Sequence, residues 1–148
     1  MKIVQFNNKK ISGISIRTTN ANEMNPETAK IGALYQQFDK NVSVDYKNGA
    51  RVYGVYFNYE SDASGEFSVL SGADQVETSN ISLEEITLPD GKYLVFEATG
   101  EMPHAVIETW GKIWAYFSTE KSQEKRTYIT DFEFYKNQNE VDIYIGIK

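Results

Sequence analysis

Residues 126–134, RTYITDFEF, follow the plan of residues 51–59, RVYGVYFNY. Arginine, tyrosine and phenylalanine recur at matching places, and both segments are rich in the β-branched and aromatic residues that favour strands. After each segment comes a turn-rich stretch and then another predicted strand, EFSVLSG (66–72) or VDIYIGIK (141–148). The pattern indicates two copies of one unit.

Each copy also contains a predicted helix. Residues 25–41, NPETAKIGALYQQFDKN, and residues 102–121, MPHAVIETWGKIWAYFSTEK, carry apolar side chains at helical spacing. We expect the first helix to begin at Asn25 as N-cap, with Pro26 at its first position. An alternating strand precedes each helix, ISGISIRTT before the first and GKYLVFEATG before the second.

These elements predict an α+β fold of duplicated strand-helix-strand-strand units. We expect the units to form an antiparallel sheet with two main helices and a ligand groove between the halves, with the strands joined in one larger sheet or in two facing sheets. We expect a single domain, residues 1–148, with internal repeats at about 1–75 and 76–148.

Composition excludes several kinds of site and partner. The chain has a net charge of −6, no cysteine and one histidine, His104, so disulfides, thiolate zinc sites and histidine-rich metal clusters are excluded. No basic cluster points to direct nucleic-acid binding. The opening MKIVQFNNKKISG has no apolar signal core, and no run of about 18 apolar residues follows. We expect a cytoplasmic protein without cofactor or membrane contact.

Strand alternation defines two faces of residues 126–134 and the residue that follows. We predict the helix-packed face to consist of Tyr128, Thr130, Phe132 and Phe134. The mixed face then carries Ile129, Asp131, Glu133 and Tyr135, and its counterpart in the first copy includes Tyr56. Our hypothesis is that Glu133 binds a lipophilic cation among aromatic rings, from which Tyr56 and Tyr135 follow as ring walls. The alternative is that this face is solvated.

The duplicated plan, the segment ETWGKIWAYF, the acid in DFEFY and the terminal VDIYIGIK together resemble the GyrI-like small-molecule-binding domains. That family also forms the effector-binding half of some AraC-type and MerR-type multidrug regulators. The resemblance covers nearly the whole chain and implies binding of drugs or dyes, with an acid in the penultimate strand contacting positive charge. By position that acid resembles Glu133, and Trp110 and Tyr144 resemble the aromatic walls. No helix-turn-helix segment is present, so the chain resembles a stand-alone ligand-binding version.

A second acid, Glu97, lies among apolar residues in LVFEAT and is a candidate for the same groove, with a solvent-facing position as the alternative. Some GyrI-like proteins hydrolyse reactive cyclopropane compounds, so hydrolysis assisted by Glu133 and Glu97 is an alternative function. A third is a protein-binding, gyrase-inhibitor-like role. The sequence also leaves a protein partner or a homodimer open.

Overall fold

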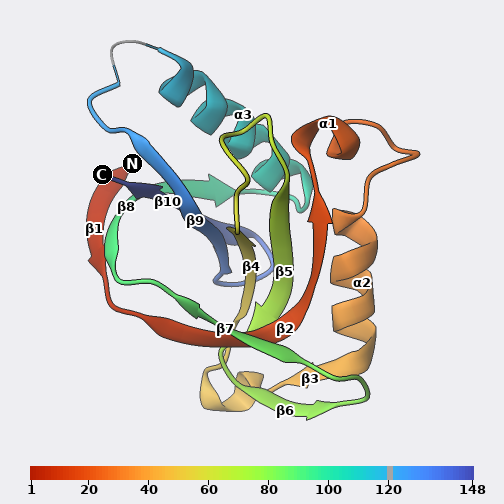
Figure 1. Cartoon of the computed structure of the whole chain (residues 1–148). Coiled ribbons are helices and arrows are strands. Elements are labelled where there is room, and N and C mark those ends of the chain that lie inside the picture. Colours follow the sequence, from red (N-terminus) through yellow and green to blue (C-terminus); the bar gives the residue numbers. More distant parts are fainter. Residues whose placement is uncertain (120–121) are drawn as a thin grey trace.

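The computed structural model describes residues 1–119 and 122–148, in which strands dominate (Figure 1). The strands are β1 (Lys2–Phe6), β2 (Lys9–Thr18), β3 (Val42–Val44), β4 (Val52–Phe57), β5 (Phe67–Ala73), β6 (Val76–Ser79), β7 (Glu84–Leu88), β8 (Gly91–Thr99), β9 (Arg126–Tyr135) and β10 (Glu140–Ile147). The helices are α1 (Asn20–Glu23), α2 (Ile31–Asn41), α3 (His104–Ser118) and the 3-10 helix η1 (Tyr46–Asn48). This is the predicted α+β class, with two short helical elements, α1 and η1, beyond the two expected helices.

Eight strands form one antiparallel sheet in the order β1-β8-β10-β9-β4-β5-β2-β7, and β3 pairs with β6 separately. The two sequence copies correspond to the elements β2-α2-β4-β5 and β8-α3-β9-β10, whose strands all belong to this sheet. They meet where β4 pairs with β9, so the two matching sequence segments lie side by side. The division into one domain with two repeats stays a prediction, although strands of both halves share this sheet.

The edge strands pair differently from a simple duplication. Although β7 and β8 follow each other along the chain, β7 pairs with β2, and β1 pairs with β8. Each half therefore completes the sheet edge of the other, because β1 and β2 are joined by residues 7–8 alone and β2 then runs across the curled sheet toward its opposite edge (Figure 1).

The sheet curls, so its two ends approach each other across one face, which we call the inner face. Its cluster centres on Phe132, whose ring lies 5.1 Å from that of Phe6 in β1. Leu88 of β7, from the other end of the sheet, belongs to the same cluster, as do Tyr53 and Val55 of β4. The inner face is therefore filled by the sheet itself.

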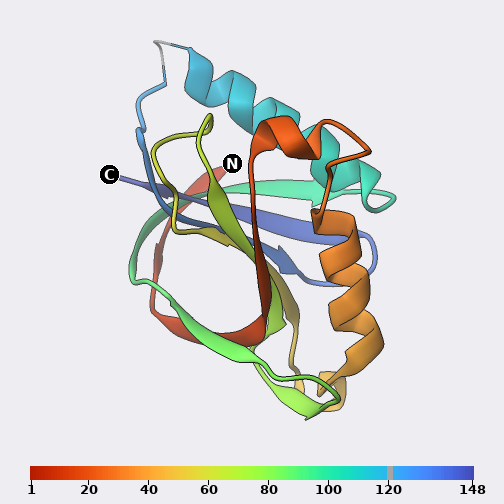
Figure 2. The ribbon, with the colours of Figure 1, turned by 45° about the vertical axis from the view of Figure 1, so that its right-hand side comes forward.

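Helices α2 and α3 both cover the opposite face, the helix face (Figure 2). Leu34 of α2 packs there on Tyr56 and Val69, and Ile113 of α3 packs on the strands β8 and β10. Our assignment of faces was thus wrong, because the helices pack on the side of Glu133 and the Phe132 side is buried by curling. Alternation alone cannot tell two buried faces apart.

Helix boundaries were predicted unequally well. The second helix was expected from residue 102, and α3 begins at His104; the expected end at residues 120–121 lies outside the described residues. The expected start of the first helix at Asn25 was wrong, because α2 begins at Ile31. Asn25 caps a turn, accepting from the Glu27 backbone N–H, while the Glu23 carboxylate accepts from the N–H of Ile31 at 3.1 Å. Within the described part of the chain, no helix has the length and apolar character to cross a bilayer.

Candidate functional site

Glu133 lies at the centre of the helix face and is 1% exposed. Its carboxylate accepts four hydrogen bonds, two at each oxygen. At Oε1 the donors are the hydroxyls of Tyr35 (2.9 Å) and Tyr135 (2.7 Å). At Oε2 they are the Tyr56 hydroxyl and the Trp110 indole N–H, both at 2.7 Å. The alternative of a solvated Glu133 is therefore wrong, and we call these five residues the glutamate cluster.

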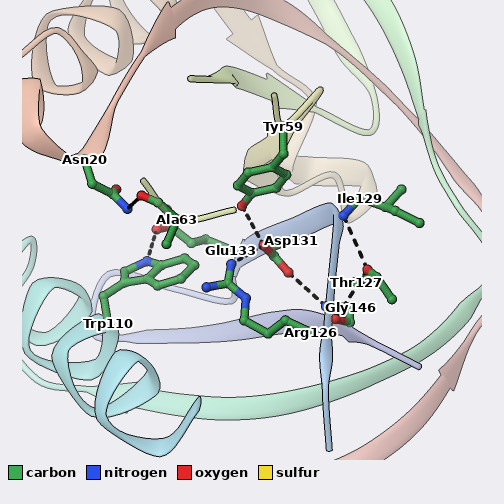
Figure 3. A network of polar contacts seen from close by, with 10 residues as sticks. All are labelled: Asn20, Tyr59, Ala63, Trp110, Arg126, Thr127, Ile129, Asp131, Glu133 and Gly146. Atoms are coloured by element: carbon green, nitrogen blue, oxygen red, sulfur yellow. Dashed lines mark hydrogen bonds and ion pairs between the residues drawn. The ribbon is translucent and has the colours of Figure 1, made fainter. Parts of the chain in front are cut away.

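Four elements bring the glutamate cluster together. Tyr35 comes from α2, Tyr56 from β4, Trp110 from α3 and Tyr135 from β9. The apolar stripe of each helix turns its ring toward the sheet, and Trp110 packs with the residues of α2 and β4. Figure 3 shows the Trp110 indole reaching Glu133 from α3. The cluster thus joins both sequence copies and both helices.

The four rings enclose the carboxylate at steep angles to one another. Tyr56 and Trp110 are nearly perpendicular, with centroids 5.2 Å apart, and Tyr35 and Tyr135 are 6.3 Å apart at 84°. Tyr35, Tyr135 and Trp110 are each half-buried, so they form a lining one residue thick between the carboxylate and the surface. Beside Trp110 lies the ring of Trp114, which is 39% exposed.

The phenols in the cluster are neutral donors. Burial, reinforced by the negative charge of Glu133, raises the pKa of Tyr35, Tyr56 and Tyr135 above its usual value. In residues 1–119 and 122–148 no salt bridge to Glu133 is formed. Among these residues, the hydrogen-bonding capacity of the carboxylate is therefore satisfied by neutral donors alone, without an ion pair.

Gly54 makes room for this arrangement, since it lies directly opposite Glu133 in the β4–β9 ladder. A Cβ placed on Gly54 would collide with the Tyr35 hydroxyl oxygen and would lie 2.8 Å from Glu133 Oε1. A glycine inside a strand often marks such a close approach, and that was the available sequence signal. Tyr35 was also not predicted as a site residue, although it belongs to the apolar stripe of its helix and carries a hydroxyl group.

A second buried acid, Asp131, lies two residues away on the same face and is 0% exposed. Its Oδ2 accepts from Arg126 Nη2 at 2.7 Å and from the Tyr59 hydroxyl at 2.6 Å, and its Oδ1 accepts from the Gly146 N–H (Figure 3). The Arg126 guanidinium also lies 4.3 Å from the Tyr128 ring centroid. This acid is therefore balanced by a buried cation.

Tyr128 was expected on the Phe132 face and lies instead against Arg126 and Tyr59, beside the buried ion pair. Asn58 and Tyr128 have φ angles of 51° and 53°, left-handed values that are uncommon outside glycine. Asn58 directly follows β4, and Tyr128 lies near the start of β9. The alternation of side chains counted from the middle of each strand therefore does not hold beyond these two residues.

Tyr144 and Glu97 lie apart from the glutamate cluster. Tyr144 is on the inner face, where its ring stacks on Phe132 at 4.5 Å and 11°. Glu97 is exposed, and its cross-strand partner on β10 is Asp142. The cross-strand partner of Glu133 on β10 is the next residue, Ile143, so Glu97 and Glu133 belong to adjacent rows of paired residues. Adjacent rows face opposite sides, so the carboxylate pair expected for the hydrolase alternative is not formed by these two residues. The structure thus unites Glu133 with Trp110, Tyr56 and Tyr135 of the predicted site.

Metal binding by protein side chains finds no support in the part of the chain that the structure describes. No group of three or more His, Asp or Glu side chains is placed there to hold a metal ion. The cluster consists of one carboxylate and aromatic donors, a set suited to organic ligands rather than to metal coordination.

The comparisons with known proteins agree with this architecture. The family model Cass2, described as integron-associated effector binding protein, matches residues 2–147. The YobU protein of Bacillus subtilis (strain 168) is 32% identical over 161 residues, which cover 99% of this chain and 96% of YobU.

Solved structures share the fold. The integron cassette protein VCH_CASS2 of Vibrio cholerae is 43% identical, with a TM-score of 0.89 over 99% of this chain and 95% of that chain. SAV2435, solved with bound tetraphenylphosphonium, is 19% identical, with a TM-score of 0.67 over 99% of this chain and 93% of that chain. The resemblance to GyrI-like small-molecule-binding domains is confirmed. The chain belongs to the Cass2 family of integron-associated effector binding proteins.

Proposed function

We propose that the protein binds amphipathic organic cations between α2 and α3, above Glu133. The observation that carries this proposal is a buried carboxylate held by four neutral donors with no salt bridge among the described residues. A buried charge without a counter-charge is costly to a fold. A cationic ligand offsets that cost when it binds, so electrostatic attraction to Glu133 favours the binding of such a ligand.

The rings supply the apolar part of the recognition. Aromatic faces attract cations by about 0.5–2 kcal/mol each, depending on exposure to water. Along α3, Ile107 is 65% exposed and Trp114 is 39% exposed, and they flank Trp110 on one apolar stripe. A lipophilic ligand can first contact this exposed stripe. The half-buried rings of Tyr35 and Trp110 then move apart to admit it.

Two further observations support a cationic ligand. The net charge of −6 attracts cations over a longer range than any single contact. The fold of SAV2435, which bound tetraphenylphosphonium, is also the fold of this chain. Tetraphenylphosphonium combines one positive charge with aromatic rings, the chemistry that the glutamate cluster complements.

Glu133→Gln tests the proposal because it removes the charge and keeps the shape. At roughly 6 Å and an effective dielectric constant of about 20, two unit charges attract by about 3 kcal/mol. We expect methyltriphenylphosphonium to bind about 10- to 100-fold more weakly to the variant. Triphenylphosphine oxide, which is similar in shape and neutral, should bind the variant and the natural protein alike. Isothermal titration calorimetry measures both.

The matched control is Glu97→Gln. It removes the same unit of charge from an exposed position on the other face of the sheet. It should leave the affinity for methyltriphenylphosphonium within about twofold, because exposed charges are screened by salt. Equal losses for the cation and the phosphine oxide in Glu133→Gln, or equal losses in both variants, would contradict the proposal.

A further inference from the structure

The glutamate cluster leaves the carboxylate no free hydrogen-bonding position. An ionised carboxylate offers about four lone-pair sites, and Glu133 accepts four hydrogen bonds, two at each oxygen. All four donor distances fall between 2.7 and 2.9 Å. A ligand therefore finds the negative charge of Glu133 present and its acceptor sites occupied.

This occupancy separates two kinds of organic cation. A protonated amine carries N–H donors, so it needs an acceptor when it leaves water, and it has to displace one of the four donors to reach Glu133. The displaced group loses its own partner, and the Trp110 indole N–H is a donor that cannot reverse its role. A quaternary ammonium or phosphonium ion has no N–H and needs no acceptor.

The four donors also transmit the effect of the Glu133 charge to the aromatic rings. Each ring points its O–H or N–H edge at the carboxylate, and hydrogen bonding to an anion polarises the donor group. Greater electron density on the rings strengthens their attraction for a cation lying against their faces. Trp110 and the adjacent Trp114, whose centroids are 6.3 Å apart, present such faces near the surface.

Asp131 shows what a cation with N–H donors requires. Its Oδ1 accepts from a single donor, the Gly146 N–H, and its Oδ2 accepts from Tyr59 and Arg126. Asp131 thus has three donors, one of which is the cation itself. An N–H cation is bound directly where the neutral donors leave an acceptor position for it.

We propose that the site selects onium ions without N–H, such as quaternary ammonium and phosphonium ions, over protonated amines of equal size. This inference rests on the proposed function. The Tyr35 hydroxyl is the specificity determinant that can be tested most directly, because it comes from a half-buried ring on α2 and completes the pair of donors at Oε1.

The test compares (9-anthracenylmethyl)trimethylammonium with protonated N,N-dimethyl-9-anthracenylmethylamine, which has a proton in place of one methyl group. At neutral pH both carry one positive charge. We expect the natural protein to bind the quaternary ion at least about tenfold more tightly, as one lost charge-assisted hydrogen bond implies. Fluorescence titration of the anthracene measures both affinities.

Tyr35→Phe keeps the ring and frees one lone pair of Oε1. In this variant we expect the preference to fall to about threefold or less, because the protonated amine gains an acceptor. Tyr135→Phe frees the same oxygen and serves as the second variant if Tyr35→Phe does not fold. Tyr59→Phe is the matched control, since it removes a phenol hydroxyl from Asp131 and should leave the preference unchanged.

The outcomes separate this inference from the proposed function. A preference that survives both Tyr35→Phe and Tyr135→Phe would reflect only the stronger hydration of an N–H cation and would overturn the inference. Equal affinities in the natural protein, with binding still dependent on Glu133, would also overturn it while leaving the proposed function intact. Quaternary-ion binding that ignores Glu133→Gln, or no binding of either cation, would overturn both.

Discussion

Asp131 and Glu133 lie two residues apart on one strand, share one face of the sheet and are 0% and 1% exposed, yet only Asp131 is paired with a cation. Arg126 forms a buried ion pair with Asp131 at 2.7 Å, whereas Glu133 is held by neutral rings. Hydrogen bonding is satisfied at both acids, so hydrogen bonding is not what distinguishes them. The difference is charge balance, and under the proposed function Asp131 stabilises the fold while Glu133 binds a ligand.

The largest expected effect follows from removing the cation of the balanced acid. Arg126→Met leaves Asp131 buried and unpaired, which should lower the free energy of unfolding by about 3–5 kcal/mol. Urea denaturation followed by far-UV circular dichroism measures this loss. The double variant Arg126→Met with Asp131→Asn should recover part of it, because no buried charge is then left alone.

Glu133→Gln is the counterpart at the other acid and should change the free energy of unfolding by about 1 kcal/mol or less. The new amide nitrogen can face Tyr35 and Tyr135, whose hydroxyls rotate to accept, while its oxygen still accepts from Trp110 and Tyr56. If Glu133→Gln destabilised the protein as much as Arg126→Met, the assignment of Glu133 to a ligand and of Asp131 to the fold would be wrong.

Much of this fold follows from sequence pattern. The repeated segments 51–59 and 126–134 predicted the matching strands that meet at the centre of the sheet, and helical periodicity predicted α3 closely. Strand alternation around Glu133 predicted Tyr56 and Tyr135 as aromatic walls of the site, and both donate to Glu133. Trp110, the third predicted wall that donates to Glu133, came from the resemblance to the GyrI-like domains. The strands, the helix and the two tyrosines follow from local periodicity, which the chain carries within single elements.

The features that sequence did not predict depend on how distant elements meet. Curling buries both faces of the sheet, so polarity could not say which face the helices cover. The Arg126 and Asp131 pair was missed because Tyr128 has a left-handed φ of 53°, which alters the alternation between them. Tyr144 was expected in the site, but the register places it in the Phe132 row on the inner face.

Gly54→Ala should disturb the hydrogen bonds of Glu133 and leave those of Asp131 in place. The added Cβ would collide with the Tyr35 hydroxyl, so Tyr35 has to leave Glu133 or the strand has to shift. We expect about 1–3 kcal/mol of destabilisation, as for an overpacked core, together with weaker binding of methyltriphenylphosphonium. Thermal unfolding and calorimetry measure the two effects.

Gly32→Ala is the matched control, since a Cβ on this α2 glycine meets nothing within 4 Å. Alanine is also the better helix former, so stability should stay the same or rise by up to about 1 kcal/mol. Gly54→Ala with stability and affinity equal to those of Gly32→Ala would show that the close approach at Gly54 is not needed.

The last prediction concerns the phenols, which should behave alike at both acids. Burial raises the pKa of Tyr35 beside Glu133 and of Tyr59 beside Asp131 above that of an unfolded tyrosine. From near pH 10 upward the unfolded chain loses these protons while the folded protein keeps them, so stability falls as pH rises. Each tyrosine contributes a slope of about 1.4 kcal/mol per pH unit, and none of this loss occurs below that range.

Tyr35→Phe and Tyr59→Phe should therefore each reduce the alkaline slope by about 1.4 kcal/mol per pH unit. Urea denaturation at a series of pH values measures it. A slope unchanged by Tyr35→Phe would mean that this hydroxyl ionises freely in the folded state and does not hold Glu133. Equal reductions would show that both acids keep neutral phenol partners, so Arg126 alone accounts for the difference in their charge balance.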